Sequence, residues 1–235
     1  MKFRITKRFY FIAFRVIRHY PSYKISENLK LKNSPHISRR QAGSIIIVEA
    51  VMFNSYREDV TTALKAISPE RVKEVVDILR RAQSQNANVY ILGNGGSAAT
   101  ASHFANDLLR CGIRSVALTD LTPTILAYGN DFGWDEMFAG PLRQFLFPQD
   151  VVIFISCSGN SQNIVSSMRM VKDINIPLLK TIVLTGSDMN CQLVQYIPTV
   201  IVFVPFRDIR VQEDCHMVIC HAVIGELCNA AAKAD

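Results

Sequence analysis

Apolar runs and helix-like repeats alternate along most of this chain. Short runs rich in β-branched residues predict strands that are buried on both faces, as in a parallel sheet. They cover residues 88–92, 115–118, 151–155, 180–184 and 199–204. Strands that alternate with helices predict an α/β fold, here a three-layer αβα sandwich with a five-stranded parallel sheet.

Apolar residues spaced three and four apart predict the helices between these strands. One of them has a clear start, with Ser68 as N-cap, Pro69 at the first helical position and Glu70 in the first turn. Gly129–Gly133 predicts a loop that separates two helices. The predicted helices cover residues 48–67, 69–85, 98–110, 122–128, 135–147, 162–172 and 211–233, with one more between the last two strands.

The net positive charge of the chain comes from its first 50 residues. That segment holds eleven Lys and Arg residues and two acidic residues, which gives +9. The rest carries 26 − 11 = 15 bases and 20 − 2 = 18 acids, or −3, against a total of +6. Because the body is mildly acidic, the composition does not indicate a nucleic-acid partner.

Residues 1–45 differ from the rest and are predicted to be a basic extension outside the fold, with residues 46–235 forming one domain. The apolar stretch Phe9–Phe14 is too short to span a bilayer, and no signal-peptide cleavage pattern follows a long apolar core, so we expect no membrane partner. The Arg-rich, acid-poor composition permits an organelle transit peptide. A second interpretation is a start codon assigned too far upstream, with Met52 as the real beginning.

The six cysteines show no paired spacing, and no export signal accompanies them. Reduced thiols in a cytoplasmic compartment are the simplest interpretation. The cysteines are Cys111, Cys157, Cys191, Cys215, Cys220 and Cys228.

The segment Ser156–Ser161 follows the central strand and precedes a helix. A strand, a Gly/Ser turn and a helix start in that order direct free backbone N–H groups and the positive end of the helix dipole at one point, where three hydroxyls also converge. This arrangement predicts an anion site, and we expect a sugar phosphate there. An ordinary βα turn with a serine N-cap has the same local sequence.

A second loop, Gly93–Ser97, follows the first predicted strand, and both loops lie at the carboxyl ends of strands, where ligands bind in such sheets. With Ala98 the loop fits a loose dinucleotide fingerprint, and Asp120 follows the next strand as a ribose-binding acid does. Nicotinamide binding would leave the serine loop and the histidines of the body without a role, so the phosphate interpretation is preferred.

Histidines of the body lie beside carboxylates. His103 and Asp107 are four residues apart and share one face of a helix, while Glu213 and His221 are eight apart on the last helix. Two imidazoles with carboxylates are suited to a divalent metal. They are equally suited to proton transfer beside a carbonyl, and single pairs of this kind are commonly solvated surface pairs.

Five motifs in this order resemble the sugar isomerase (SIS) domain family, and its phosphoheptose isomerase branch in particular, over roughly residues 48–229. The resemblance implies the SIS fold, a homotetramer with active sites between subunits, and aldose–ketose isomerisation of a ketose phosphate such as sedoheptulose 7-phosphate through an enediol. The motifs are Gly93–Ser97, Ser102–Ala105, Gly129–Gly133, Ser156–Ser161 and the closing helix.

The resemblance also assigns roles to single residues. Asp107 and His221 become the catalytic pair, and zinc or another divalent metal is implied at His103, Asp107, Glu213 and His221. Ser156, Ser158 and Ser161 would hold the phosphate, with Cys157 at the middle position of that loop. Asn94, Gly95, Gly96, Asn130 and Asp131 would line the sugar, and Ser97 and Glu213 are further candidate substrate-binding residues.

Two departures from the branch bear on the substrate. Asp107 stands where the branch has a catalytic Glu. The branch has a Gln ligand eight residues before its last His, and if His221 sets the register, Glu213 rather than Gln212 fills that place. Because Asp107 is one methylene shorter than Glu, its carboxylate is displaced by about 1 Å, which costs on the order of a hundredfold in rate.

The competing hypothesis is a non-catalytic module of the same fold that binds a sugar phosphate or a protein. We expect the enzyme to act in heptose or surface-glycan precursor metabolism.

Overall fold

The computed structural model describes residues 39–186 and 188–231. The chain divides into two units, residues 1–53 and residues 54–235. Helix α2 (Arg39–Ala66) spans the boundary and begins before the predicted residue 48. Most of the predicted extension, residues 1–38, lies outside the described residues, so its separation from the fold stays a prediction.

The second unit alternates strands with helices, as its apolar pattern predicts. Ser68 caps the second helix, because its Oγ accepts a hydrogen bond from the Arg71 N–H (3.2 Å). The elements are α3 (Pro69–Ser84), β1 (Val89–Gly93), α4 (Gly96–Arg110), β2 (Ser115–Ala117), the 3₁₀ turn η1 (Leu118–Asp120), α5 (Thr122–Phe132), α6 (Glu136–Phe145), β3 (Val151–Ser156), α7 (Gln162–Ile174), β4 (Lys180–Gly186), α8 (Gln192–Gln195), β5 (Val200–Val204) and α9 (Ile209–Ala231).

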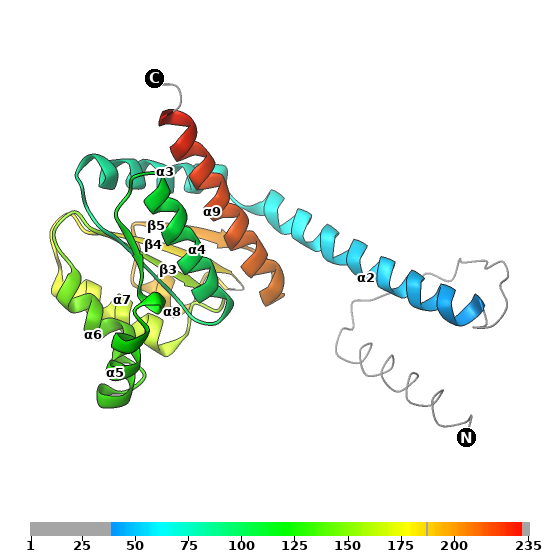
Figure 1. Ribbon diagram of the computed structural model, residues 1–235, viewed down its shortest axis with the longest axis horizontal. Helices are drawn as coiled ribbons and strands as arrows, with labels where there is room; N and C mark the ends of the chain where they lie inside the picture. The colour runs from blue at the N-terminus through cyan, green and yellow to red at the C-terminus, as the bar shows by residue number, and fades with distance from the viewer. Residues whose placement is uncertain (1–38, 187, 232–235) are drawn as a thin grey trace. The chain divides into compact units, whose positions relative to one another are not determined.

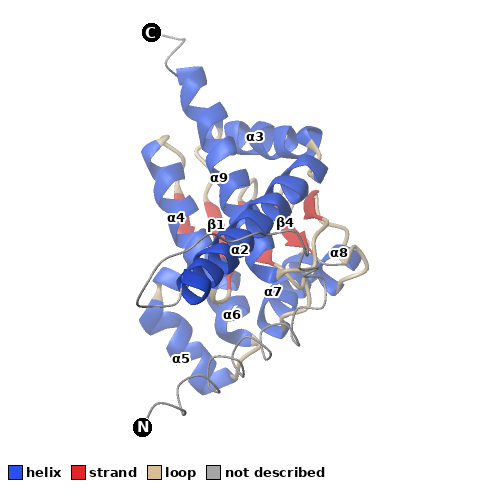
Figure 2. Cartoon of the chain, turned by 90° about the vertical axis from the view of Figure 1, so that its right-hand side faces the viewer, coloured by secondary structure: helices blue, strands red, loops and turns tan. Residues whose placement is uncertain are grey.

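The five strands form one parallel sheet in the order β2-β1-β3-β4-β5. Strand β3 is central and buried at every residue, as its unbroken apolar run predicts. Helices cover both faces (Figure 2). One apolar core lies between the sheet and α3, α4 and α9, and a second lies between the sheet and α5 to α8 (Figure 1). The predicted αβα sandwich is confirmed.

The predicted loop Gly129–Gly133 is wrong, because α5 continues to Phe132. Gly133 is the residue that ends the helix, with φ of +93° in the left-handed region. Gly129 costs about 1 kcal/mol within a helix relative to alanine, which the packing of the helix can outweigh.

The prediction that all thiols are reduced is also wrong. Cys111 and Cys228 form a disulfide with a Cα–Cα distance of 5.9 Å, and the other four cysteines are free and buried. The two partners are 117 residues apart in the sequence. Their spacing carries no signal because the fold, rather than the local sequence, brings α4 and α9 together.

His216 is fully buried in α9, and neither ring nitrogen has a hydrogen-bond partner among the described residues. Burial lowers the pKa of its imidazole to about 4; the nearby Thr185 backbone opposes this shift, although no hydrogen bond of normal geometry joins them. The unfolded chain, with a pKa near 6.5, therefore binds more protons than the folded chain between these two values.

We accordingly expect the free energy of unfolding to fall by roughly 2 kcal/mol from pH 7 to pH 5 because of His216 alone. Urea denaturation at both pH values measures it. In His216→Leu this part of the pH dependence disappears, whereas His221→Gln, which alters an exposed imidazole of the same helix, retains it. Equal pH dependence in the wild type and His216→Leu would contradict the prediction.

Candidate functional site

The strand order places two loops at one edge of the sheet. Strands β1 and β3 are neighbours, and their chain connections leave in opposite directions, β1 to β2 on one side and β3 to β4 on the other. Such a switch point is where ligands bind in open α/β sheets, beyond the carboxyl ends of the strands. The glycine loop (Gly93–Ser97) and the serine loop (Ser156–Ser161) flank this point, as predicted.

The glycine loop turns sharply into α4. Gly95 has φ of +53°, a conformation that side-chain-bearing residues rarely adopt. A Cβ on Gly93 would meet the backbone oxygen of Ser97 at 2.6 Å, so the strand-to-helix turn requires glycine there too. This turn leaves the first N–H groups of α4 facing the edge where the serine loop also lies.

A pair of amide side chains joins the two loops. Asn94 Nδ2 donates to Asn163 Oδ1 (2.8 Å), and Asn163 Nδ2 donates to Asn94 Oδ1 (2.9 Å). Asn163 is fully buried in the first turn of α7, so this pair fixes the glycine loop against the helix that follows the serine loop. Sequence reasoning missed Asn163 because it falls inside the helical pattern of residues 162–172; its position two residues after Ser161 was the available signal.

The serine loop is held by its own hydroxyls. Ser156 Oγ accepts a hydrogen bond from the Gly159 N–H (3.2 Å), and Ser158 Oγ accepts one from the Asn160 N–H (3.2 Å). Gly159 has φ of +62°, and a Cβ there would collide with Cys191. Helix α7 begins directly after Ser161, whose side chain makes no capping hydrogen bond within the described residues. The loop therefore presents hydroxyls and a helix N-terminus together, as an anion site requires.

Glu213 stands beside both loops. A Cβ on Gly96 would collide with the Glu213 carboxylate. Burial of the Cys157 thiol raises its pKa to about 11, and the negative charge of Glu213 contributes to this rise as a smaller cause. Cys157 is therefore a neutral thiol at neutral pH. Gln212 is buried against Gly186, at the end of β4, whereas Glu213 is the residue whose carboxylate lies against the glycine loop.

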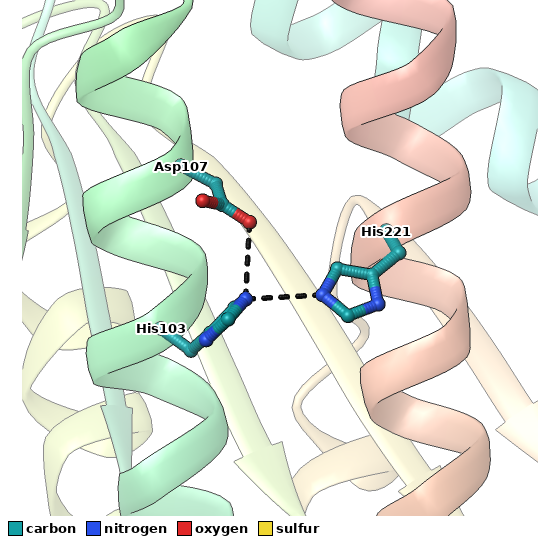
Figure 3. Close-up of side chains that lie close together, drawn as sticks. All are labelled: His103, Asp107 and His221. Atoms are coloured by element: carbon teal, nitrogen blue, oxygen red, sulfur yellow. Dashed lines mark hydrogen bonds and ion pairs between the residues drawn. The ribbon is translucent and has the colours of Figure 1, made fainter.

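Three predicted residues converge further along α4 and α9 (Figure 3). His103 Nε2 lies 3.2 Å from Asp107 Oδ2 and 3.0 Å from His221 Nε2. His103 and Asp107 meet because they are one turn apart on α4, and His221 reaches them from α9. The two imidazoles are exposed and Asp107 is partly buried. We call His103, Asp107 and His221 the polar cluster.

The chemistry of the polar cluster fits a cation. One atom of each residue faces the other two, and all three atoms lie within 4.8 Å of one another. In the tautomer that leaves Nε2 unprotonated, each imidazole directs a lone pair toward the same point as the Asp107 carboxylate. Ligand atoms around a tetrahedral Zn²⁺ lie about 3.3 Å apart, given Zn–N and Zn–O distances of about 2.0–2.1 Å, which is close to the separations in the cluster.

The remaining predicted residues lie outside the polar cluster. Glu213 precedes His221 by eight residues, about 12 Å along the helix axis, so within the described chain it belongs with the loops. Asn130 and Asp131 are exposed near the end of α5, where Asn130 Nδ2 donates to Asp131 Oδ1 (2.8 Å). The assignments of all three to sugar or metal stay predictions.

Comparison with known proteins identifies the family to which this architecture belongs. A family model of the SIS domain matches residues 53–186, more than half of the chain. The chain belongs to the SIS domain family. Within the family it resembles phosphoheptose isomerases. That of Geotalea daltonii is 32% identical over 187 residues, covering 77% of this chain and 92% of the relative, and that of Helicobacter pylori is 30% identical over 175 residues, covering 72% and 88%.

Solved structures agree on the fold. The phosphoheptose isomerase of Neisseria gonorrhoeae superimposes with a TM-score of 0.70 at 26% identity, covering 79% of this chain and 99% of that chain. The five-stranded parallel sheet with helices on both faces is therefore the SIS fold in this chain. The predicted family and branch are confirmed.

Proposed function

We propose that this SIS protein is a sugar-phosphate isomerase that converts a ketose phosphate, sedoheptulose 7-phosphate, to the corresponding aldose phosphate for heptose synthesis. The observation that carries the proposal is the polar cluster, which groups an acid, a base and a third ligand in a chain whose curated relatives are named phosphoheptose isomerase. A non-catalytic module has no need of converging imidazole and carboxylate groups, and the relatives do not favour one.

The serine loop would bind the phosphate. Ser158 and Ser161 offer hydroxyls, and the start of α7 offers backbone N–H groups and a positive dipole end. Binding energy from this remote group would orient the reacting carbons, so that the chemical step becomes effectively unimolecular. Gly96, in the glycine loop, and Glu213, which lies against it, would contact the sugar hydroxyls.

Asp107 and His221 would transfer the protons. Asp107 removes a proton from the carbon next to the carbonyl, which gives an enediol, and His221 moves a proton between the two oxygens. Return of a proton to the neighbouring carbon completes the aldose. The two residues belong to different helices and face one point, so they can act on opposite sides of the C1–C2 bond (Figure 3).

A divalent metal, preferably zinc, is part of the proposal. His103, Asp107 and His221 would hold it, because two imidazoles and a carboxylate with an open position are typical of catalytic zinc. When bound, the metal supplies Lewis acidity to the carbonyl oxygen. Metal analysis of the purified protein tests this part separately.

A homotetramer with active sites between subunits is the proposed assembly. It is supported by large apolar side chains that are exposed in and just after α5, next to Asn130 and Asp131: Leu126 at 60%, Phe132 at 67% and Trp134 at 55%. A second copy of the chain would cover them and bring these polar residues to its own site. Light scattering of the full chain measures the assembly.

The cytoplasm is the proposed location, where phosphorylated sugars are made. No helix in the described part of the chain is both long and apolar enough to cross a bilayer. Fractionation of cells that express the full chain tests the location.

The decisive experiment for the function is turnover. The full chain is mixed with sedoheptulose 7-phosphate, and the aldose product is followed by chromatography. Formation of heptose 7-phosphate is expected, whereas binding of the sugar without conversion would identify a non-catalytic module.

Ser158→Ala is expected to raise KM for the phosphorylated sugar by about tenfold with kcat nearly unchanged, because one hydrogen bond to a charged phosphate contributes about 1.5–3 kcal/mol. Its matched control is Ser166→Ala, a partly buried serine further along α7. Steady-state kinetics of both variants measure the effect. A lower kcat with unchanged KM in Ser158→Ala would contradict a phosphate-binding role.

A further inference from the structure

Helices α4 and α9 run side by side and contact each other at three levels. At the first level Glu213 lies against Gly96, near the start of both helices. The second level is the polar cluster. At the third level the disulfide joins Cys111, at the end of α4, to Cys228. One polar contact, one ligand cluster and one covalent bond thus follow each other along a single helix pair.

The levels are matched in register. Successive levels are separated by seven and then eight residues in α4, and by eight and then seven in α9, about 10–12 Å along either axis. From the first level to the third, both helices advance by fifteen residues, so each turns by the same total angle. Sliding or rotating one helix against the other would therefore break all three levels at once.

The covalent bond is the strongest constraint on this register. Buried residues of both helices share one apolar core, but the contact at ligand distance across the helix pair is that of His221 with His103, and exposed imidazoles resist a shift only weakly. Near the disulfide, Gln83 Nε2 donates to the Cys111 carbonyl oxygen (2.7 Å) and Arg80 Nη2 donates to the Glu226 carbonyl oxygen (2.9 Å). These bonds anchor the third level to α3 as well.

We propose that Cys111 and Cys228 are positioning residues whose disulfide fixes α9 against α4 and so holds His221 at ligand distance from His103 and Asp107. The cluster's affinity for a metal then depends on the oxidation state of this cysteine pair. The inference deepens the proposed function, since it concerns the same cluster.

The oxidation state of the cysteine pair would change by thiol–disulfide exchange. A dithiol reductant gives two electrons and two protons to the Cys111–Cys228 bond, so that two protein thiols form and the reductant becomes a disulfide. Cys228 is exposed, which gives a reductant access, whereas the four free cysteines are buried. In a reducing compartment, disulfides are usually transient and regulatory, so this bond would couple the cluster to the thiol redox state.

The test measures binding of Co²⁺ alone, by its visible absorption, to the full chain. Four samples are compared: the oxidised wild type, the wild type reduced and freed of reductant, Cys111→Ser/Cys228→Ser, and Cys215→Ala as a control that removes a buried thiol from α9. Thiol titration in denaturant verifies the states, with four thiols expected before reduction and six after it.

We expect the oxidised wild type and Cys215→Ala to bind Co²⁺ about 10–100-fold more tightly than the reduced wild type and the double serine variant, the range found when support for a ligand is removed. In turnover assays, loss of the disulfide lowers kcat and leaves KM for the sugar phosphate unchanged, because the loops lie at the other end of the helices. A reductant has no effect on the double variant.

Equal Co²⁺ affinity in the oxidised wild type and the double serine variant would overturn the proposal, as would absence of Co²⁺ binding in both states. The proposed function fails separately. A chain without turnover whose Co²⁺ affinity still follows the disulfide refutes the isomerase and supports the positioning role. A chain that shows turnover but whose Co²⁺ affinity does not depend on the disulfide supports the isomerase and refutes the positioning role.

Discussion

Replacing His221 with alanine is expected to lower kcat by about 10²–10⁴-fold, the usual contribution of a positioned acid–base group. His221 is the member of the polar cluster that comes from α9, and its Nε2 lies 3.0 Å from His103 Nε2. Without it, the enediol oxygens lose their proton carrier and the cluster loses a ligand. Turnover of sedoheptulose 7-phosphate with added Zn²⁺ measures the effect.

Binding of the sugar phosphate is expected to persist in His221→Ala, because the phosphate is held by the serine loop, which lies near the start of α9, about two helical turns from His221. Isothermal titration with substrate therefore gives a Kd close to that of the wild type. Val218→Ala is the matched control, since Val218 is an exposed residue of the same helix, three positions earlier. Unchanged turnover in His221→Ala would reject the assigned role, and loss of binding would show that His221 holds the substrate rather than acting in the chemical step alone.

The centre of the sheet was predictable because its strands are buried on both faces. Such strands are apolar almost without interruption, and in β3 all six residues are buried and the first five are apolar. The position of the loops was predictable for a related reason, since a Gly/Ser turn between a buried strand and a helix marks the carboxyl end of that strand, although an ordinary βα turn has the same local sequence. The extent of α5 was not, because a glycine within a helix and a glycine that ends one look alike in sequence, and only the φ of Gly133 separates them.

Two of the three residues of the polar cluster are brought together by local helix geometry. His103 and Asp107 share a face of α4 by their spacing of four, whereas the approach of His221 depends on how α9 packs. Helix geometry also explains why Glu213 lies apart from the polar cluster. Eight residues turn a helix by about 80° beyond two full turns and advance it by about 12 Å, so Glu213 and His221 cannot be assigned to one ion from their spacing alone. The disulfide is the limiting case, since no feature of the sequence near Cys111 points to Cys228.

Asp107→Asn is expected to reduce kcat by at least about a thousandfold, because an amide can neither remove a proton from carbon nor act as a strong metal ligand. Asp107 Oδ2 lies 3.2 Å from His103 Nε2. The contact therefore depends on the charged carboxylate as well as on the length of the side chain, and asparagine preserves only the length. The comparison with Asp107→Glu is the more informative one. The cluster already closes around the shorter side chain, and an added methylene displaces the carboxylate by about 1 Å, which costs on the order of a hundredfold.

The kinetics of the two variants therefore distinguish a site built around aspartate from a weakened version of the glutamate site that the family resemblance implies. A hundredfold loss in Asp107→Glu, with Co²⁺ still bound, indicates that α4 and α9 are spaced for the shorter base. A gain in kcat would mean that the native aspartate is displaced from the reacting carbon, and would refute that spacing. Asn106→Ala, an exposed neighbour on α4, serves as the control for general effects on the helix, and its kcat is expected to stay within about twofold of the wild type.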